Sequence, residues 1–282
     1  MPSVPDPLPA RDPLPDSADE QRSDDSLTFI GNATVLLRIG CFTILTDPNF
    51  LRRGQRAYLG RGLWTRRLLD PAITVDDVPR LDAVVLSHLH GDHWDRVARA
   101  GLDRRPPLVT TKHAARRLRV QGFSTHGLTT WTDHVLAKDN EKLRIVSLPG
   151  VHARGPLGKV LPPVMGSLLQ HEVQGRTRLR VYLSGDTLTG DHLDAVHERY
   201  PDIDVAVMHL GGTRILASTV TMDAAQGVDF LRRVKPRAAV PVHYDDYKIM
   251  RSPLSAFLQS VRRADLDDVV RPVRRGETVT LV

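Results

Sequence analysis

Three histidines and one aspartate fall within six consecutive positions of the chain, residues 88–93, which have the sequence HLHGDH and are called the histidine segment below. The chain has 12 histidines in 282 residues, so a quarter of them lie here. Neutral imidazole and carboxylate groups are ordinary ligands of zinc and similar divalent ions. Because the segment contains no thiolate, a closed structural site built from cysteines is disfavoured. The segment therefore predicts a metal site rather than a group of core histidines.

The residues around the histidine segment indicate how its side chains are positioned. Leu81 to Leu86 form a short apolar run with β-branched residues, which predicts a buried strand that ends just before His88. In an extended segment residues i and i+2 point the same way, so His88 and His90 can face a common point. Gly91 permits a tight reversal of the chain, and a helix is expected soon after His93.

Three more candidate ligands follow predicted strands elsewhere in the chain. His152 comes after the strand LRIVSLPG, Asp186 follows RLRVYLSG, and His243 lies in AVPVHYDD. Loops at the carboxyl ends of strands are where α/β sheets usually gather their sites. The candidate metal ligands are therefore seven residues: His88, His90, Asp92, His93, His152, Asp186 and His243. Seven ligands are too many for one tetrahedral ion and suit two ions that share a carboxylate.

The elements that must carry these ligands alternate along the chain. From Leu27 the sequence LTFIGNATVLLRIGCFTILTDP predicts short strands joined by hairpin turns. After the histidine segment, apolar strand-like runs alternate with helical stretches up to the C-terminus. We expect an α/β fold with mixed sheets, in one domain over residues 27–282. Residues 1–26 are rich in proline, aspartate and serine, and are expected to be a disordered tail.

One segment before the histidine segment shows no clear pattern. Residues 49–77 hold six arginines among glycine, tyrosine and tryptophan, and are expected to form a long loop. Arginines in such a loop can clamp phosphate or carboxylate groups. The alternative, which the sequence favours slightly, is a solvated loop in an arginine-rich protein.

Composition places further bounds on the protein. The single cysteine, Cys41, excludes an intramolecular disulfide and is expected as a small buried strand residue. No run reaches the length of a membrane span and the N-terminus lacks the pattern of a secretory signal, so a soluble cytoplasmic protein is expected. The net charge of +6 favours an anionic partner. Nucleic acid is an alternative substrate, disfavoured because no basic stretch interleaved with aromatic residues is present.

The order of the motifs resembles a known enzyme superfamily. SHLHGDH followed by GVH, SGDT and VHY is similar to the metal-binding pattern of the metallo-β-lactamase superfamily, and the resemblance covers residues 27–282. TDP at residues 46–48, the segment TVTMDAAQGVDFLRRVKPRAAVPVHYDDY and PLSAFLQSV look like the branch that includes ascorbate-6-phosphate lactonase and N-acyl-phosphatidylethanolamine phospholipase D. The resemblance implies an αββα sandwich of two mixed β-sheets flanked by helices, with the metal site at one edge.

The resemblance also implies which ion each candidate ligand would hold. The residues implied for the first ion are His88, His90 and His152. Those implied for the second ion are Asp92, His93 and His243, and the bridging ligand is Asp186. Zinc is expected because the second motif position is a histidine, where diiron relatives carry glutamate. Manganese is the alternative.

Two such ions would support a hydrolase. Together they can lower the pKa of a shared water to near neutrality and supply a hydroxide for attack on a carbonyl or phosphoryl centre. Asp92 could bind metal and also accept a proton. We therefore expect a dinuclear metal-dependent hydrolase that cleaves a phosphodiester or a lactone or ester bond in an anionic substrate, either a small molecule or a phospholipid-like one. The alternatives are a metal-binding sensor or assembly protein without turnover, and a nuclease that acts on RNA or DNA.

Three further residues lie close to these motifs in the sequence. His209 could donate a proton to a leaving group or be an ordinary strand-end histidine. Asp47 could support a ligand histidine or cap a turn, and Tyr244 could orient substrate or pack. Substrate specificity is expected in two variable loops, residues 49–77 and 153–167. Nothing in the sequence indicates an oligomeric state.

Overall fold

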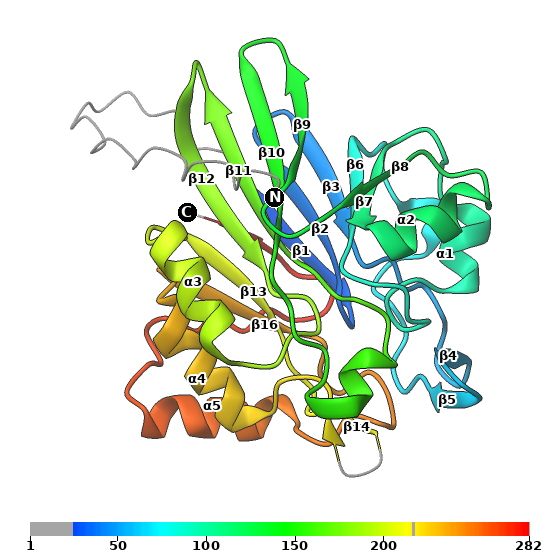
Figure 1. Ribbon diagram of the computed structural model, residues 1–282, viewed down its shortest axis with the longest axis vertical. Coiled ribbons are helices and arrows are strands. Elements are labelled where there is room, and N and C mark those ends of the chain that lie inside the picture. Colours follow the sequence, from blue (N-terminus) through cyan, green and yellow to red (C-terminus); the bar gives the residue numbers. More distant parts are fainter. Residues whose placement is uncertain (1–24, 216–217, 282) are drawn as a thin grey trace.

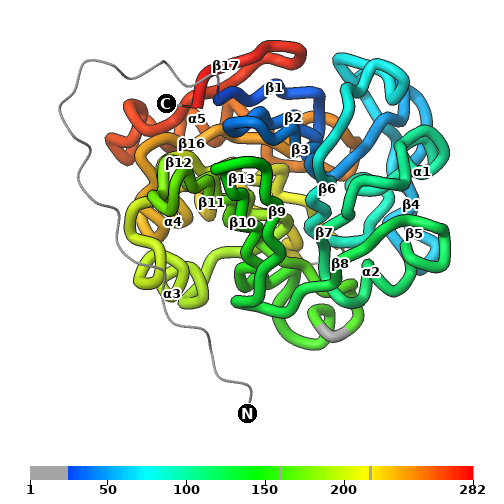
Figure 2. Tube along the Cα trace, turned by 90° about the horizontal axis from the view of Figure 1, so that it is seen from above, coloured from blue at the N-terminus to red at the C-terminus, as the bar shows by residue number. Residues whose placement is uncertain are grey.

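The computed structural model describes residues 25–215 and 218–281, and these form four layers. Two β-sheets pack face to face, and helices lie on the outer face of each sheet (Figure 1). Figure 2 shows the same layers from above, with α1 and α2 beside one sheet and α3, α4 and α5 beside the other. The expected tail, residues 1–26, lies outside the described residues except for Asp25 and Ser26, and Ser26 begins the first strand.

The first sheet has seven strands and contains the N-terminal meander. Its strands, in spatial order, are β17 (Thr278–Thr280), β1 (Ser26–Gly31), β2 (Thr34–Ile39), β3 (Phe42–Thr46), β6 (Ala83–Leu86), β7 (Leu108–Thr111) and β8 (Thr125–Leu128). Strands β17, β1, β2 and β3 pair antiparallel, whereas β3, β6, β7 and β8 pair parallel. The connections between the parallel strands β6, β7 and β8 form two helices, α1 (Arg96–Gly101) and α2 (Lys112–Arg119).

The second sheet has six strands and is also mixed. Its strands, in spatial order, are β16 (Ala238–Val242), β13 (Val205–His209), β12 (Arg176–Leu183), β11 (Gly166–Val173), β10 (Glu141–Leu148) and β9 (Asp133–Lys138). The helices that accompany it are α3 (Asp191–Arg199), α4 (Ala224–Val234) and α5 (Leu254–Arg263). Strands β10, β12, β13 and β16 run in the same direction, so their carboxyl ends lie at one end of the sheet.

Apolar cores join each pair of layers. Between the sheets, Phe29 of the first packs in one core with Leu169 of the second. Outside the second sheet, Phe230 of α4 and Phe257 of α5 share a core with its strands. Outside the first sheet, Leu118 of α2 packs in a third core. The expected αββα sandwich is therefore confirmed, and burial of these faces is its main stabilising term.

The arginine-rich segment 49–77 differs from the long loop that the sequence predicts. It contains a hairpin of β4 (Arg56–Gly60) and β5 (Leu63–Arg66), followed by the 3-10 turn η1 (Val75–Asp77). These strands are short and interrupted by glycine and arginine, so they lack a readable alternation. The other short elements are η2 (Gly155–Lys159), β14 (Arg214–Ile215) and β15 (Ser218–Thr219).

Two further expectations concern the burial of Cys41 and the presence of membrane-spanning helices. Cys41 lies exposed in the turn between β2 and β3, so the prediction that it is buried in a strand is wrong. Gly40 adopts a φ of 52°, and the chain turns at Gly40 and Cys41 between the two strands. Within the described part of the chain, no helix is long and apolar enough to cross a membrane.

One buried carboxylate, just after the histidine segment, fastens the start of α1 to the loop that follows β3. Asp95 is the N-cap of α1, and its Oδ1 accepts hydrogen bonds from the amides of Val97 and Ala98, both at 2.8 Å. Its Oδ2 accepts from the amides of Phe50 at 2.6 Å and Leu51 at 2.7 Å. A single side chain thus satisfies four backbone donors on two segments that meet only through tertiary packing.

We predict that Asp95→Ala lowers the free energy of unfolding by about 3 kcal/mol, because it removes a helix cap and leaves buried amides without an acceptor. The measurement is urea denaturation followed by circular dichroism. The matched control is Asp103→Ala, since Asp103 pairs with Arg105 at the surface, and its loss should cost no more than ~1 kcal/mol. Equal effects of the two substitutions would contradict this role for Asp95.

Candidate metal centre

The seven predicted ligands meet where strands of both sheets end. The histidine segment follows β6 in the first sheet, and His152, Asp186 and His243 follow β10, β12 and β16 in the second. All seven side chains are buried, and His90 has the largest exposed fraction, 8%. Their ligand atoms form groups in which every pair lies within 4.8 Å. The structure therefore brings together all of the predicted ligands.

The first group consists of three histidine rings. Nε2 of His88 lies 2.9 Å from Nδ1 of His90, and Nε2 of His152 lies 3.2 Å from the same atom. Two nitrogens bound to one tetrahedral zinc ion at about 2.0–2.1 Å would be roughly 3.3 Å apart. The three ring nitrogens thus converge with the spacing of a metal site.

The second group combines one carboxylate with two histidines. Oδ2 of Asp92 lies 3.4 Å from Nε2 of His243 and 3.9 Å from Nε2 of His93. Asp186 connects this group with the first, because its Oδ2 lies 3.1 Å from Nε2 of His93 and 3.8 Å from Nε2 of His88. One carboxylate oxygen therefore lies between the two groups, in the position that a bridging ligand needs.

Two carboxylate oxygens in the centre accept no hydrogen bond within the described part of the chain. Oδ1 of Asp92 and Oδ1 of Asp186 are buried and accept no hydrogen bond from the residues that the structure describes. An ionised oxygen that is buried and unpaired is costly. The ion pairs of these two carboxylates within the described residues are all with histidine rings. Histidine nitrogens and carboxylate oxygens that lack a hydrogen bond are suitable ligands for a divalent cation. The residues of both groups therefore fit such ions.

The outer nitrogens of two ligand candidates are tied to the backbone. Nδ1–H of His152 donates to the carbonyl oxygen of Val220 at 3.0 Å, and Nδ1–H of His243 donates to that of Leu210 at 3.0 Å. A carbonyl oxygen only accepts, so Nδ1 must carry the proton in each ring. In the neutral ring Nε2 then has a free lone pair, which is the form that binds metal.

Asp47 contacts the outer nitrogens of two other candidate ligands, that of His88 through Ser87 and that of His93 directly. Its Oδ1 accepts hydrogen bonds from the Ser87 amide at 2.8 Å and from the Ser87 hydroxyl at 3.0 Å. Because that hydroxyl proton is used, Nδ1–H of His88 donates to Ser87 Oγ, at 3.0 Å. Oδ2 of Asp47 lies 3.4 Å from Nδ1 of His93 and 3.3 Å from Nε2 of His209. Asp47 therefore lies in the supporting position that the sequence suggested as one of its two roles.

The ring atoms of His209 and Tyr244 are already engaged by neighbouring residues. His209 ends β13, and its ring nitrogens face Asp47 and, at 3.2 Å, the hydroxyl of Ser184, which leaves neither for a leaving group. Tyr244 is half-buried and packs on Phe29, with ring centroids 6.0 Å apart. The histidines without a predicted partner lie outside the centre: His113, His126, His134, His171, His192 and His197.

The two groups differ in their electrostatics. Burial lowers the pKa of all three first-group histidines, that of His90 to about 4, so their rings are neutral. Burial also acts to lower the pKa of His93 and His243, but nearby carboxylates, Asp186 foremost, raise both above the usual value. Burial acts to raise the pKa of Asp186, yet His243 and His93 hold it well below normal. The ionised carboxylates therefore lie near the second group, and their negative charge favours the binding of a cation there.

Gly91 joins the histidine segment to the β4–β5 hairpin. Its amide donates to the carbonyl oxygen of Tyr58 at 2.9 Å, and its own carbonyl accepts from Asn49 Nδ2 at 3.1 Å. A Cβ at position 91 would lie 2.5 Å from the Tyr58 carbonyl oxygen and 2.7 Å from its amide nitrogen. The sequence suggested a tight reversal as the reason for this glycine. The structure shows that close backbone approach is what excludes a side chain here.

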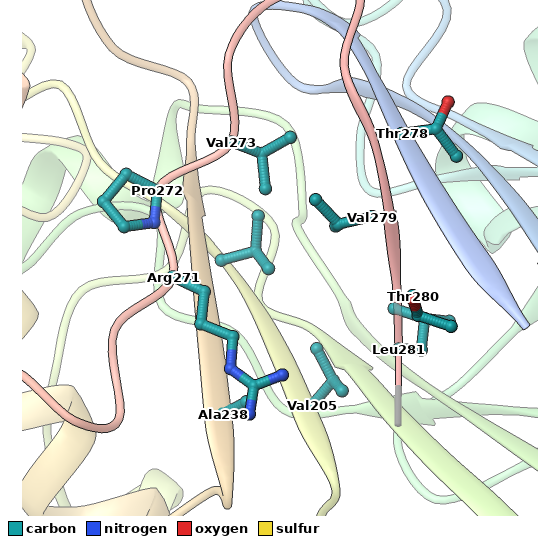
Figure 3. A pocket seen from close by; sticks show the side chains of 10 residues that line it. Val205, Ala238, Arg271, Pro272, Val273, Thr278, Val279, Thr280 and Leu281 are labelled. Carbon is teal, nitrogen blue, oxygen red and sulfur yellow. The ribbon is translucent and has the colours of Figure 1, made fainter.

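A separate cavity lies away from the centre. It has a volume of about 400 Å³ and lies between β13, β16 and residues 271–281 (Figure 3). Valine, leucine and threonine side chains line most of it, and among its lining residues, all of them described, Arg271 carries the single charge. None of the seven candidate ligands lines this cavity.

Known proteins are similar to this chain in sequence over most of their length. A family model described as a beta-lactamase superfamily domain matches residues 43–244. A UPF0173 metal-dependent hydrolase of Exiguobacterium sp. is 26% identical over 241 residues, which are 86% of this chain and 95% of the relative. A UPF0173 metal-dependent hydrolase of Pyrococcus furiosus is 24% identical over 257 residues, 90% of this chain and 99% of the relative.

Solved structures show the same fold. A possible metal-dependent hydrolase from Veillonella parvula superposes with a TM-score of 0.77 at 23% identity, over 91% of this chain and 99% of that one. An isothiocyanate hydrolase from Delia radicum gut bacteria superposes with a TM-score of 0.76 at 21% identity, over 90% and 98%. With the family match, these superpositions confirm the predicted metallo-β-lactamase fold.

We predict that Gly91→Ala lowers the free energy of unfolding by about 1–3 kcal/mol, because the new methyl group meets the backbone of Tyr58 and forces the hairpin away. Thermal and urea unfolding measure the change. Gly190→Ala is the control, because the nearest atom there is 3.3 Å away in the movable side chain of His192. Full stability in Gly91→Ala would show that the hairpin does not depend on this contact.

We predict that Asp47→Asn weakens zinc binding about 10- to 100-fold while the fold is retained, because an amide cannot accept from both Ser87 and a ligand histidine. Competition with a fluorescent chelator measures the affinity, and circular dichroism checks the fold. Asp82→Asn is the control, since Asp82 pairs with Lys138 outside the centre. Zinc affinity equal to that of the unaltered protein would refute this supporting role.

Proposed function

The chain belongs to the family of beta-lactamase superfamily domains, and from this premise we propose that it is a dinuclear metal-dependent hydrolase. The observation that carries the proposal is the place of Asp186 Oδ2, which lies 3.1 Å from Nε2 of His93 and 3.8 Å from Nε2 of His88. One carboxylate shared by two histidine groups is the arrangement that a pair of ions requires. The relatives named metal-dependent hydrolases support the same reading.

In this proposal each group holds one divalent ion. The first ion would be held by His88, His90 and His152 and the second by Asp92, His93 and His243, and the Asp186 carboxylate lies between the two groups. A pair of divalent ions supplies a hydroxide nucleophile near neutral pH and stabilises negative charge on the substrate. Zinc is the proposed metal, because nitrogen ligands dominate the first group, and manganese is the alternative.

The chain's own residues would position the ions and move the proton. Asp92 is the proposed proton acceptor, since its Oδ1 is buried, has no partner among the described residues and belongs to a carboxyl of lowered pKa. Its carboxylate form is therefore present at neutral pH. Asp47, through Ser87 and His93, would keep the rings of the two groups in their ligating orientation.

The finer assignments are also proposals. The proposed bond is a phosphodiester or a lactone or ester bond, as in the branch with ascorbate-6-phosphate lactonase and N-acyl-phosphatidylethanolamine phospholipase D that the motifs resemble. The proposed substrate is anionic, and the proposed location is the cytoplasm. The competing function is a metal-binding sensor or assembly protein, which the same ligand set would serve without turnover. A nuclease that acts on RNA or DNA is a further alternative.

The test uses protein stripped with a chelator and reloaded with Zn²⁺ or Mn²⁺, assayed on bis(p-nitrophenyl) phosphate, a simple lactone and single-stranded RNA. We expect metal-dependent cleavage of at least one of the first two. Asp186→Asn should lower that rate at least about 100-fold. This effect should exceed that of losing a residue that only hydrogen-bonds to a metal ligand. Asp191→Asn, an exposed change on α3, is the control. Metal binding without turnover would favour the sensor, and a metal-dependent rate retained in Asp186→Asn would refute the dinuclear site.

A further inference from the structure

A groove of about 1120 Å³ opens beside the metal centre. His90, the most exposed of the candidate ligands, and Gly91 line one part of it. Its other walls come from the β4–β5 hairpin, from α1 and α2, and from residues 157–163 around η2. The volume is that of a site for an organic molecule rather than for an ion alone. The two loops in which the sequence places specificity both contribute to it.

The groove carries an unusual amount of exposed apolar surface. Tyr58 and Trp64, on facing strands of the hairpin, are 45% and 55% exposed, and their ring centroids lie 4.7 Å apart. Val160, on the opposite loop, is 42% exposed. Leu157, Leu161 and two prolines of the same loop add to the apolar lining. Large apolar side chains left in water beside a reactive centre are typical of a binding site for an apolar group.

The charges that line the groove are almost all positive. Five arginines contribute to it: Arg56, Arg61, Arg96, Arg99 and Arg117. None of them forms an ion pair with a residue in the described part of the chain. The one acidic lining residue is Asp95, whose oxygens are already occupied by four backbone amides. The groove is therefore complementary to an anion.

The hairpin is fixed relative to the metal centre. The Tyr58 carbonyl accepts from the Gly91 amide inside the histidine segment, and Arg96 Nη1 donates to the carbonyl of Arg56 at 3.3 Å. A ligand held against Tyr58 and Trp64 is thus held at a set position relative to His90. Such anchoring lets contacts far from the reacting bond orient that bond.

We propose that this groove binds the non-reacting part of the substrate, and that the substrate is a single amphiphilic anion. Its aromatic or other apolar group packs on Tyr58, Trp64 and residues 157–163, and its anionic group pairs with the groove arginines. This inference rests on the proposed function for the reaction itself. It adds the class of substrate and the residues that select it.

The test measures binding by isothermal titration calorimetry, with naphthalene-2-sulfonate as the probe because sulfonate is a weak metal ligand. We expect it to bind at least about tenfold more tightly than methanesulfonate, which lacks the apolar group, or 2-naphthalenemethanol, which lacks the charge. Trp64→Ala should weaken it about fivefold and the double change Arg99→Gln with Arg117→Gln about tenfold. The controls are Leu69→Ala, exposed outside the groove, and Arg262→Gln with Arg263→Gln on α5.

The binding measurements distinguish failure of the groove proposal from failure of the hydrolase proposal. Asp186→Asn should keep the affinity for naphthalene-2-sulfonate, so the groove can be confirmed even where the hydrolase proposal fails. Probe affinity that is unchanged by Trp64→Ala and by the arginine pair would overturn the groove while leaving hydrolysis untouched. Binding to phosphatidylglycerol vesicles without binding of the soluble probe would also overturn it, because it would place a membrane surface, not one molecule, against these residues.

Discussion

Buried carboxylates among histidines are the constraint around which this protein is built. Asp47, Asp92 and Asp186 are removed from water, and their ion pairs within the described residues are with imidazole rings. Such charge is costly to bury unless cations and hydrogen bonds compensate it. Histidine rings from both sheets offset the cost of burying these carboxylates. The candidate centre therefore forms only where the two sheets end at the same edge.

The backbone near the centre is held in conformations that non-glycine residues seldom adopt. Asp47 has a φ of 36°, His243 a φ of 60° and Asp245 a φ of 59°. Each costs about 1–2 kcal/mol and persists because the surroundings fix it. The His243 amide donates to the Asn32 carbonyl at 2.8 Å, and Asn32 Nδ2 donates to the Asp92 carbonyl at 2.6 Å. The turn between β1 and β2 is thereby connected to a candidate ligand from each sheet.

The sequence predicted which side chains lie together at the candidate centre, because the candidate ligands occur in local motifs. A strand followed by HLHGDH places its histidines in a way that local geometry alone determines, and the other ligands follow apolar runs that predict strands. Arg67 illustrates what could not be predicted. It is fully buried, bonded to Asn49 and paired with Asp246, 179 positions away, although arginine is normally a surface residue.

The groove could not be predicted for the same reason. Tyr58 and Trp64 read as members of an arginine-rich loop, and only tertiary packing brings them opposite residues 157–163. Gly91 likewise was linked to a turn, whereas its actual constraint is the backbone of Tyr58. Sequence patterns therefore predicted residues that the structure brings together, while the proposed substrate groove emerged only from contacts between distant segments.

The most direct measurement is X-ray anomalous scattering at the zinc edge from crystals of the reloaded protein. Two peaks about 3.5–4 Å apart are expected, one among His88, His90 and His152 and one beside Asp92, with Asp186 between them. A single peak, or peaks that lie away from these residues, would contradict the dinuclear centre.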